Sequence, residues 1–237
     1  VEGETIKTLI SKLKISIKNI YSSPKIQTTK KTRFISNATH LLRLDNDSKG
    51  YTKKDFILFE EKVIEAIINL DCIIISDYDK GVCSESLTRK IIIKANNKKI
   101  PVFVDPKGKN WNKYLNATCL TPNKKEAESE LGVKLVNDLD FEKAAQLIIN
   151  KYKLKSCLIT RGSEGMTYKV LNNIFHQRVD KKEVFDVSGA GDLVIACLSA
   201  AFNSGLSIED SLKLSSYVSS EVVTHIGTVP FDIGMLK

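Results

Sequence analysis

The sequence has few of the patterns that mark membrane, secreted or metal-binding proteins. No stretch approaches the roughly 18 consecutive apolar residues of a membrane-spanning helix, and no basic-then-apolar signal peptide opens it. The five cysteines are odd in number and never stand in C-x-x-C spacing, which argues against a disulfide framework or a zinc site. The three histidines are isolated. We therefore expect a cytoplasmic protein with reduced thiols and no membrane partner.

The positive charge of the chain does not indicate a nucleic-acid partner. The formal net charge is +8, but the lysines are spread along the chain. Clusters such as Lys30-Lys31 and Lys181-Lys182 are short and have no interleaved aromatic residues on which bases could stack. A solvated, lysine-rich surface explains the charge, and a locally basic pocket would also suit an anionic small substrate.

The composition, 42% hydrophobic and 27% charged, is that of a globular protein, and from Asp71 onward the sequence alternates between strand-like and helix-like segments. Apolar runs with polar ends predict strands at 72–76, 102–105, 117–121 and 156–160. Helices are predicted at 85–98, 126–131 and 141–152, and an antiparallel edge pair within 166–179. Two helices follow Gly189, the second capped by Ser207 with Asp210. This order predicts an α/β fold with a mainly parallel central sheet between helices.

The first part of the chain has a different character. An amphipathic segment at 4–13 precedes two polar-flanked strands at 28–36 and 40–45. No internal repeat or low-complexity linker separates this part from the rest, so we expect one domain over 1–237. Within it, 28–45 would form lid or edge strands and 71–237 the nucleotide-binding core.

Polar side chains follow four of the predicted strands, and in open parallel sheets ligands bind beyond these carboxyl ends. The segments are Ser76-Asp77, Asp105-Pro106-Lys107-Gly108, Thr121-Pro122-Asn123 and Thr160-Arg161-Gly162. One polar strand end is commonplace, because turns need polar residues. Four of them, with both signs of charge, indicate a site along this edge.

The stretch "DVSGAGD", 186–192, places three small residues and then an aspartate at the start of an apolar helix. Backbone N–H groups that no side chain covers, together with the helix dipole, suit a phosphate. Asp192, in the first turn, could accept a proton from an attacking hydroxyl beside that phosphate. The alternative is a glycine-rich turn with an ordinary N-terminal acid. The segment is neither G-x-G-x-x-G nor G-x-x-x-x-G-K-[ST].

"DVSGAGD", followed by a small-residue apolar helix, resembles the C-terminal signature of the ribokinase-like (PfkB-type) carbohydrate kinases. "LTPNKKEAESELG" resembles the Asn-x-x-Glu segment of that family, and "ITRGSEGM" its nucleotide-binding turn, in the same order along the chain. The resemblance implies a ribokinase-like three-layer sandwich. A narrower similarity, in "TKKTRFISNATHLLRLD", "IISDYDKGV", "PVFVDPKGKNWNKYLNATCLTPN" and "HIGTVP", is to the heptose-7-phosphate kinase branch.

Residue by residue, the resemblance implies that Asp192 is the catalytic base, which takes the proton of the anomeric hydroxyl of the sugar. The backbone of Ser188, Gly189, Ala190 and Gly191 would form the anion hole for the γ-phosphate of ATP.

The resemblance also implies how the nucleotide and the metal are held. Asn123 and Glu126 match the motif that organises the phosphates and Mg²⁺, with Glu126 acting on the metal through water. Further matches along the nucleotide pocket are Thr160, Gly162, Gly165 and Ser216. Ser216 stands where relatives often carry an asparagine.

The candidate contacts to a sugar phosphate come from the strand-end loops. They are Asp77, Lys80, Asp105 and Lys107. The two lysines could neutralise an anionic substrate or the transferring phosphoryl group; the alternative is that they are solvated loop charges. The chain departs from the family at Leu193, where relatives commonly have threonine or serine, and at Cys197, which replaces a smaller residue.

The resemblance also bears on completeness and partners. The sugar-gripping N-terminal strands of the family, with their Gly-Gly-Ala-Ala-Asn segment, do not precede Thr28, so we expect an N-terminally truncated family member. The expected activity is transfer of the γ-phosphate of ATP to O1 of D-glycero-D-manno-heptose 7-phosphate, in ADP-heptose and lipopolysaccharide synthesis. The alternatives are another sugar kinase of this fold or a non-catalytic nucleotide- or sugar-phosphate-binding remnant. A homodimer and a fused or separate nucleotidyltransferase are compatible partners.

Overall fold

The computed structural model describes residues 2–36, 39–47, 51–179, 189–224 and 231. The chain divides into two compact units, which are taken separately below. The first comprises Val1–Leu70 with Lys80–Val82, and the second Asp71–Asp79 with Cys83–Lys237. Ser188, one of the expected anion-hole residues, lies outside the described residues.

The first unit holds two helices and a separate two-stranded sheet. Its elements are α1 (Glu2–Lys12), β1 (Lys30–Ser36), β2 (Thr39–Asn46) and α2 (Lys53–Ala66). The antiparallel pairing of β1 with β2 confirms the two strands predicted there. Helix α2 was not predicted; it begins in a capping box between Thr52 and Asp55. Hydrogen bonds from Thr52 hold the pKa of Asp55 well below its ordinary value, and Tyr21 donates a further one.

The second unit is built on a six-stranded sheet in the order β3-β4-β5-β6-β7-β8. The strands are β3 (Ile73–Ser76), β4 (Val102–Asp105), β5 (Cys119–Leu120), β6 (Ser156–Thr160), β7 (Met166–Val170) and β8 (Asn173–Gln177). The first four are mutually parallel, and β7 and β8 add antiparallel to the end, as the sequence predicts. Strand β5 is shorter than the predicted 117–121, but Thr118 and Thr121 continue its backbone hydrogen bonds to β4.

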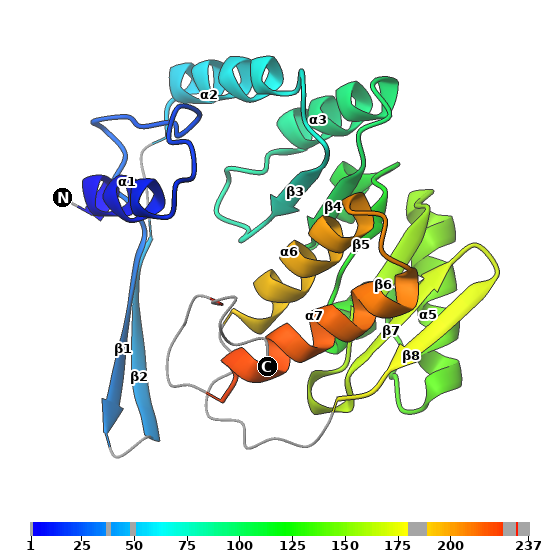
Figure 1. Ribbon diagram of the computed structural model, residues 1–237. Coiled ribbons are helices and arrows are strands. Elements are labelled where there is room, and N and C mark those ends of the chain that lie inside the picture. Colours follow the sequence, from blue (N-terminus) through cyan, green and yellow to red (C-terminus); the bar gives the residue numbers. More distant parts are fainter. Residues whose placement is uncertain (1, 37–38, 48–50, 180–188, 225–230, 232–237) are drawn as a thin grey trace. The chain divides into compact units, whose positions relative to one another are not determined.

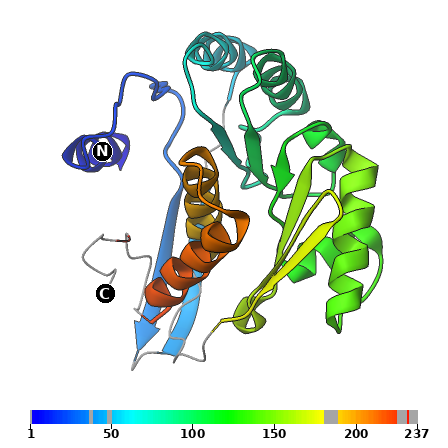
Figure 2. The ribbon, with the colours of Figure 1, turned by 45° about the vertical axis from the view of Figure 1, so that its right-hand side comes forward.

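Helices cover both faces of this sheet, which confirms the three-layer α/β architecture (Figures 1 and 2). Helix α5 (Asp138–Tyr152) packs on β6 and β7. In the same layer, η1 (Trp111–Tyr114) contacts both α5 and α3 (Glu85–Asn97), and α4 (Lys124–Leu131) contacts α5. On the opposite face, α6 (Ala190–Asn203) packs on β3 and β4, and α7 (Ile208–Val222) contacts β8.

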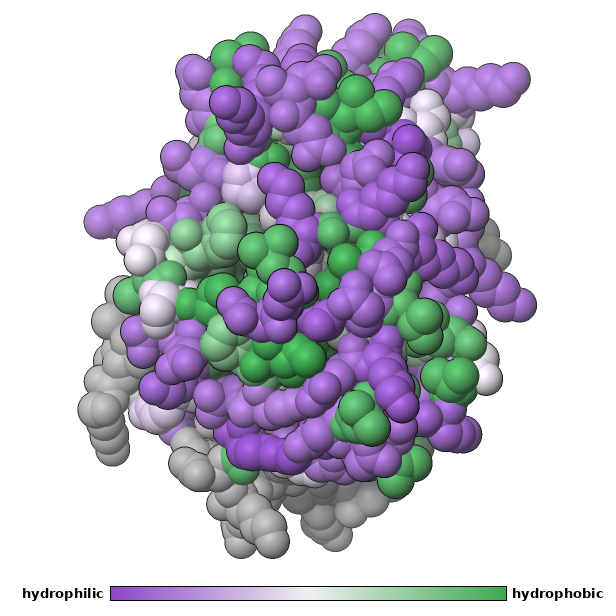
Figure 3. Space-filling view, turned by 90° about the vertical axis from the view of Figure 1, so that its right-hand side faces the viewer, coloured by the Kyte–Doolittle hydropathy of each residue, from purple (hydrophilic) through white to green (hydrophobic). Residues whose placement is uncertain are grey.

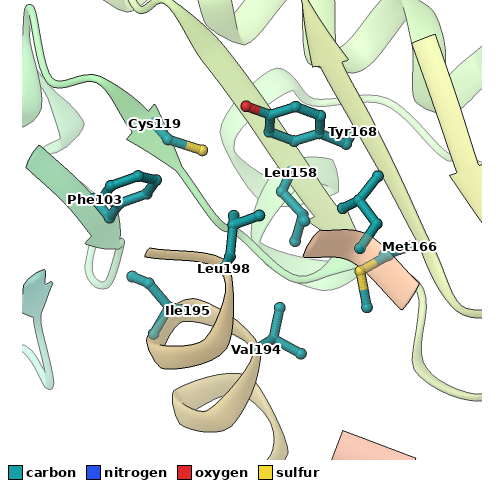
Figure 4. Packing of buried hydrophobic residues seen from close by; sticks show 9 residues of the cluster. Phe103, Cys119, Leu158, Met166, Tyr168, Val194, Ile195 and Leu198 are labelled. Atoms are coloured by element: carbon teal, nitrogen blue, oxygen red, sulfur yellow. The ribbon is translucent and has the colours of Figure 1, made fainter. Parts of the chain in front are cut away.

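The core between the sheet and α6 explains why these segments adopt these elements. Residues Val194, Ile195 and Leu198 recur at helical spacing and are buried against strand residues such as Phe103 and Leu158 (Figure 4). The cysteines belong to this interior pattern and none forms a disulfide: Cys119 and Cys157 are fully buried, and Cys72, Cys83 and Cys197 are partly buried. This confirms free thiols.

Hydrophilic side chains predominate on the face shown in Figure 3, with hydrophobic ones among them. In the second unit, Val136, Leu147 and Leu171 are examples of exposed apolar side chains. Single residues of this kind are normal for a folded surface. No helix in the described ranges has the length and apolar character needed to cross a bilayer.

Gly165 connects η2 (Gly162–Glu164) to β7 in a conformation that only glycine tolerates, with φ 96° and ψ −132°. A Cβ there would lie 2.0 Å from the carbonyl oxygen of Gln177. We expect Gly165→Ala to lower the free energy of unfolding by about 3 kcal/mol, from backbone strain and this clash.

The measurement is urea denaturation of the full-length protein, with Gly132→Ala as the matched control. Gly132 also has a positive φ, of 67°, but nothing lies within 4 Å of its Cβ position. In Gly132→Ala, the left-handed backbone alone should lower the free energy of unfolding, by about 1 kcal/mol. Equal losses in the two variants would show that the contact with Gln177 does not constrain this turn.

Candidate functional site

Acidic side chains converge at the carboxyl ends of β3 and β4 and at the first turns of α4 and α6. Burial raises the pKa of Asp105 to about 7, and the charges of Glu126, Asp192 and Asp77 add to that rise while Lys107 opposes it. Like charges held close together make ionisation of each carboxyl harder. The structure thus brings together four of the acidic residues singled out in the sequence.

Asp77, directly after β3, is the most completely bound of these carboxylates. Its Oδ2 accepts hydrogen bonds from Lys113 Nζ at 2.5 Å and Tyr114 OH at 2.6 Å. Its Oδ1 accepts from the backbone N–H of Asp79 at 2.7 Å. The Asp77 side chain is 2% exposed and that of Lys113 is 10% exposed. This buried pair fixes the loop that leaves β3.

The Asn-x-x-Glu segment forms the capping box of α4. Asn123 accepts a hydrogen bond from the backbone of Glu126 at 3.0 Å, and Glu126 Oε2 accepts from the backbone of Asn123 at 2.9 Å. The other oxygen, Oε1, accepts from Lys107 Nζ at 2.5 Å. Glu126 therefore shapes the start of the helix and at the same time holds a lysine that follows β4.

The start of α6 lacks the side-chain cap found at the starts of α2, α3, α4, α5 and α7. The N-cap residues Thr52, Ser84, Asn123, Asn137 and Ser207 all accept a hydrogen bond from the first turn of their helices. At α6 the N-cap is Gly189, with φ 87° and no side-chain cap.

Within the part of the chain that the structure describes, no side chain covers the first turn of α6 at Gly191. A Cβ on Gly191 would meet nothing within 4 Å. No side chain at 189–191 is larger than the methyl group of Ala190. The backbone N–H groups there are consequently available to an anion, as unpaired donors at a helix start are.

Asp192 stands at the third position of α6, and its carboxylate accepts hydrogen bonds from two hydroxyl groups at the end of β3. Tyr78 OH donates to Oδ2 at 2.9 Å, and Ser76 Oγ donates to Oδ1 at 3.3 Å. The Asp192 residue itself is exposed. A solvent-accessible carboxylate beside uncapped N–H groups can accept a proton next to a bound anion.

The turn at 160–165 adjoins this edge through a backbone bridge between Thr160 and Asn123. Arg161 anchors the turn: its backbone N–H donates to Gly165 O at 2.8 Å, and its guanidinium lies 4.1 Å from the Phe141 ring centroid. That guanidinium also donates to Asp138 at 2.6 Å.

A pocket of about 550 Å³ opens beside Lys107 and the start of α4. It is lined by Lys107, Gly108, Lys109, Trp111, Asn123, Lys125, Glu126, Ser129 and Glu130. Three lysines and the helix start give it a composition that suits an anionic group.

Comparison with known proteins decides the family. The family model for the pfkB family carbohydrate kinases matches residues 1–232. The chain belongs to the pfkB family of carbohydrate kinases. It is 36% identical over its whole length to "Bifunctional protein HldE" of Methylobacillus flagellatus, of which it covers 49%. The chain thus spans about half the length of the curated relatives it matches.

Solved structures confirm the ribokinase-like fold. Phosphofructokinase-2 from Escherichia coli superposes with a TM-score of 0.84 at 21% identity, covering 98% of this chain and 76% of that one. Arabidopsis thaliana ribokinase, solved with ribose and ATP, gives a TM-score of 0.75 at 18% identity, covering 94% of this chain and 72% of that one. At these identities the likeness concerns the fold alone.

The structure places most of the residues predicted for the site in the second unit. Asp105, Lys107, Asn123, Glu126 and Asp192 interact directly or through their charges.

Three other predicted residues differ in their surroundings. Lys80 belongs to the first unit, where it pairs with Asp47 at 2.5 Å. Ser216 is 5% exposed on α7. The carboxylate of Asp77 is bound by the protein itself, so a direct contact with sugar phosphate stays a prediction.

Sequence reasoning missed Tyr78, Lys113 and Tyr114. Tyr78 lies inside the segment "SDYDKG", whose aspartate and lysine drew attention as charged residues, while its hydroxyl did not. Lys113 and Tyr114 lie within the quoted segment 101–123, but they stand 36 and 37 residues after Asp77, and no local pattern indicates a contact with it. Only the fold brings them to the end of β3.

The two lysine–carboxylate pairs of the site give a matched test of burial. We expect Lys113→Met to lower the free energy of unfolding by about 3–5 kcal/mol, because it leaves the buried Asp77 charge without its partner. Lys107→Met, at an equally short pair whose lysine is 49% exposed, should cost less than about 1 kcal/mol. Urea denaturation of both variants checks this. Equal costs would mean that the Asp77 carboxylate does not depend on Lys113.

Proposed function

We propose that the protein is an ATP-dependent kinase that transfers the γ-phosphate to O1 of D-glycero-D-manno-heptose 7-phosphate. The observation that carries this proposal is the accessible carboxylate of Asp192 beside the uncapped first turn of α6. Family membership supports phosphotransfer to a carbohydrate. The heptose substrate is supported by the segments that resemble the heptose-7-phosphate kinase branch and by the identity to chains named HldE.

In the proposed reaction, the sugar O1–H gives its proton to Asp192 as the oxygen attacks the γ-phosphorus. The new O1–P bond forms while the bond from the γ-phosphorus to the bridging oxygen breaks, and ADP leaves with that electron pair. The N–H groups of Gly189, Ala190 and Gly191 donate to the phosphoryl oxygens. Positioning and charge stabilisation supply most of the catalysis in phosphoryl transfer.

Mg²⁺ bound with ATP would neutralise charge on the phosphates. In the described residues no group of three or more histidine, cysteine, aspartate or glutamate side chains could hold a metal alone. Mg²⁺ in kinases needs only one or two carboxylates, because phosphates and water complete its shell. Burial raises the pKa of Asp105, and the charges of Glu126 and Asp192 add to the rise, so acidic groups gather at this edge. The residues fit a cation that arrives with the nucleotide, which Glu126 would contact through water.

The other residues predicted for the site are proposed here as contacts to the nucleotide and the sugar phosphate. Thr160, Gly162, Gly165 and Ser216 would line the nucleotide pocket. Lys80, Asp77, Asp105 and Lys107 would act on the sugar phosphate or the transferring group. The relatives are named bifunctional, which supports a second activity beside the kinase. On the resemblance described above, that activity would be a fused or separate nucleotidyltransferase, and the assembly a homodimer. ATP as donor agrees with a cytoplasmic reaction.

A different sugar phosphate is the second candidate, because the solved proteins of this fold include a phosphofructokinase and a ribokinase. The Lys107 end of the site suits phosphate on any sugar. Assays of the full-length protein with ATP, Mg²⁺ and a panel of sugars and sugar phosphates separate the two candidates. Turnover of another sugar phosphate, with none of heptose 7-phosphate, would overturn the substrate assignment.

Asp192→Asn tests the reaction itself. Loss of a general base lowers kcat by roughly 10²–10⁴-fold, and we expect a loss in that range with little change in the KM for ATP. The measurement is ADP release and sugar phosphorylation by the full-length protein.

Asp210→Asn is the matched control, because Asp210 occupies the same third position of α7. Its activity should stay within about twofold of the wild type, since a first-turn acid contributes only modestly to a helix. An Asp192→Asn enzyme as active as this control would remove Asp192 from the mechanism.

A further inference from the structure

We infer that Tyr78 is a positioning residue for Asp192, whose hydroxyl holds the carboxylate in the orientation that receives the proton of the acceptor. The inference rests on the proposed function for the role of Asp192. The contact between the two side chains stands on geometry alone. Tyr78 lies two residues beyond the end of β3, and Asp192 lies in the first turn of α6, so the contact joins the two elements across the site.

The geometry leaves Asp192 able to act while it is held. Tyr78 OH is 2.9 Å from Oδ2, and Ser76 Oγ is 3.3 Å from Oδ1. A carboxylate offers about four lone-pair positions, so two donors leave room for the hydroxyl of a substrate. A base whose orientation is set by a third group is a recurring arrangement in enzymes.

The phenol of Tyr78 is suited to donate this hydrogen bond. Burial raises its pKa, and the hydrogen bond to Asp192 and the charge of that residue raise it further. The hydroxyl accordingly keeps its proton at neutral pH. Tyr78 is nevertheless 53% exposed, so the packing of its ring alone does not explain why the hydroxyl is held at Asp192.

The backbone on both sides of Tyr78 is fixed by buried contacts. Asp77 is bound by Lys113 and Tyr114, and it accepts the backbone N–H of Asp79. Asp79 has φ 55°, and Gly108 lies so close that a Cβ there would be 2.7 Å from Asp79 Oδ1. The buried pair therefore acts at the site through Tyr78, by holding the loop that presents its hydroxyl.

Asp192 lies at the same edge as the acidic side chains around Asp105. The residues whose charges act on this edge are Asp77, Asp105, Glu126 and Lys107. Three of the four are acidic, and Lys107 is engaged with Glu126 at 2.5 Å. A hydroxyl donor stabilises the charged carboxylate against these neighbours.

The kinetic test is Tyr78→Phe in the full-length protein. We expect kcat to fall roughly 10- to 100-fold, the effect of losing a hydrogen bond to a charged group, with both KM values unchanged. Tyr21→Phe is the matched control: it removes a hydroxyl that donates to Asp55 at 3.0 Å in the first unit and should leave kcat and both KM values unchanged.

A second measurement does not depend on turnover. With 3-fluorotyrosine placed at position 78, the fluorine NMR signal should titrate at lower pH in Asp192→Asn than in the protein with native Asp192, because a charge that raises the pKa of Tyr78 is gone.

The two measurements separate failure of this inference from failure of the proposed function. Wild-type kcat in Tyr78→Phe, or a rise in the KM for sugar alone, would overturn the positioning role. If the protein phosphorylates no sugar, the proposed function fails while the fluorine titration still tests the contact. Equal midpoints in the two proteins would then overturn the inference.

Discussion

The burial of Asp105 beside three other carboxylates, at the carboxyl end of the sheet, is the constraint on which this site depends. Asp77, Asp105, Glu126 and Asp192 come from four separate elements, and at Asp105 their combined effect with burial brings the pKa to about 7. Such an arrangement is stable only if donors or cations are supplied to the charged groups. This arrangement of carboxylates suits phosphoryl transfer, because carboxylates can accept a proton and attract the cation that accompanies a nucleotide.

The chain supplies a different kind of partner to each of the bound carboxylates. Asp77 has a buried lysine and a tyrosine, and Glu126 has a half-exposed lysine and its own helix start. Among the described residues, the donors to Asp192 are two hydroxyl groups. A cationic partner holds a carboxylate more strongly than a hydroxyl does. Of these three carboxylates, the one without a lysine partner among the described residues is Asp192, beside the start of α6, and it is the one that the proposed reaction uses as its base.

The sequence predicted the sheet and the ordered motifs because both depend on local patterns. Apolar runs such as 102–105 and caps such as Ser207 act within a few residues, and the mainly parallel sheet follows from the alternation of strands and helices. Helix α2 was missed although its Thr52–Asp55 box is local. The contacts of Lys113 with Asp77 and of Tyr78 with Asp192 join residues 36 and 114 positions apart, and no local pattern encodes them. The Asn123–Glu126 pair was found through its resemblance to the Asn-x-x-Glu segment of the family, but its capping geometry came from the structure.

The most direct test of this account is a crystal structure of the full-length protein with Mg²⁺, ADP, aluminium fluoride and heptose 7-phosphate. We predict the aluminium fluoride group against the N–H groups of Gly189, Ala190 and Gly191, and the acceptor oxygen of the sugar within about 3 Å of an Asp192 carboxylate oxygen, the range of a catalytic hydrogen bond. A ternary complex with the acceptor oxygen bound to another base, away from the start of α6, would contradict it.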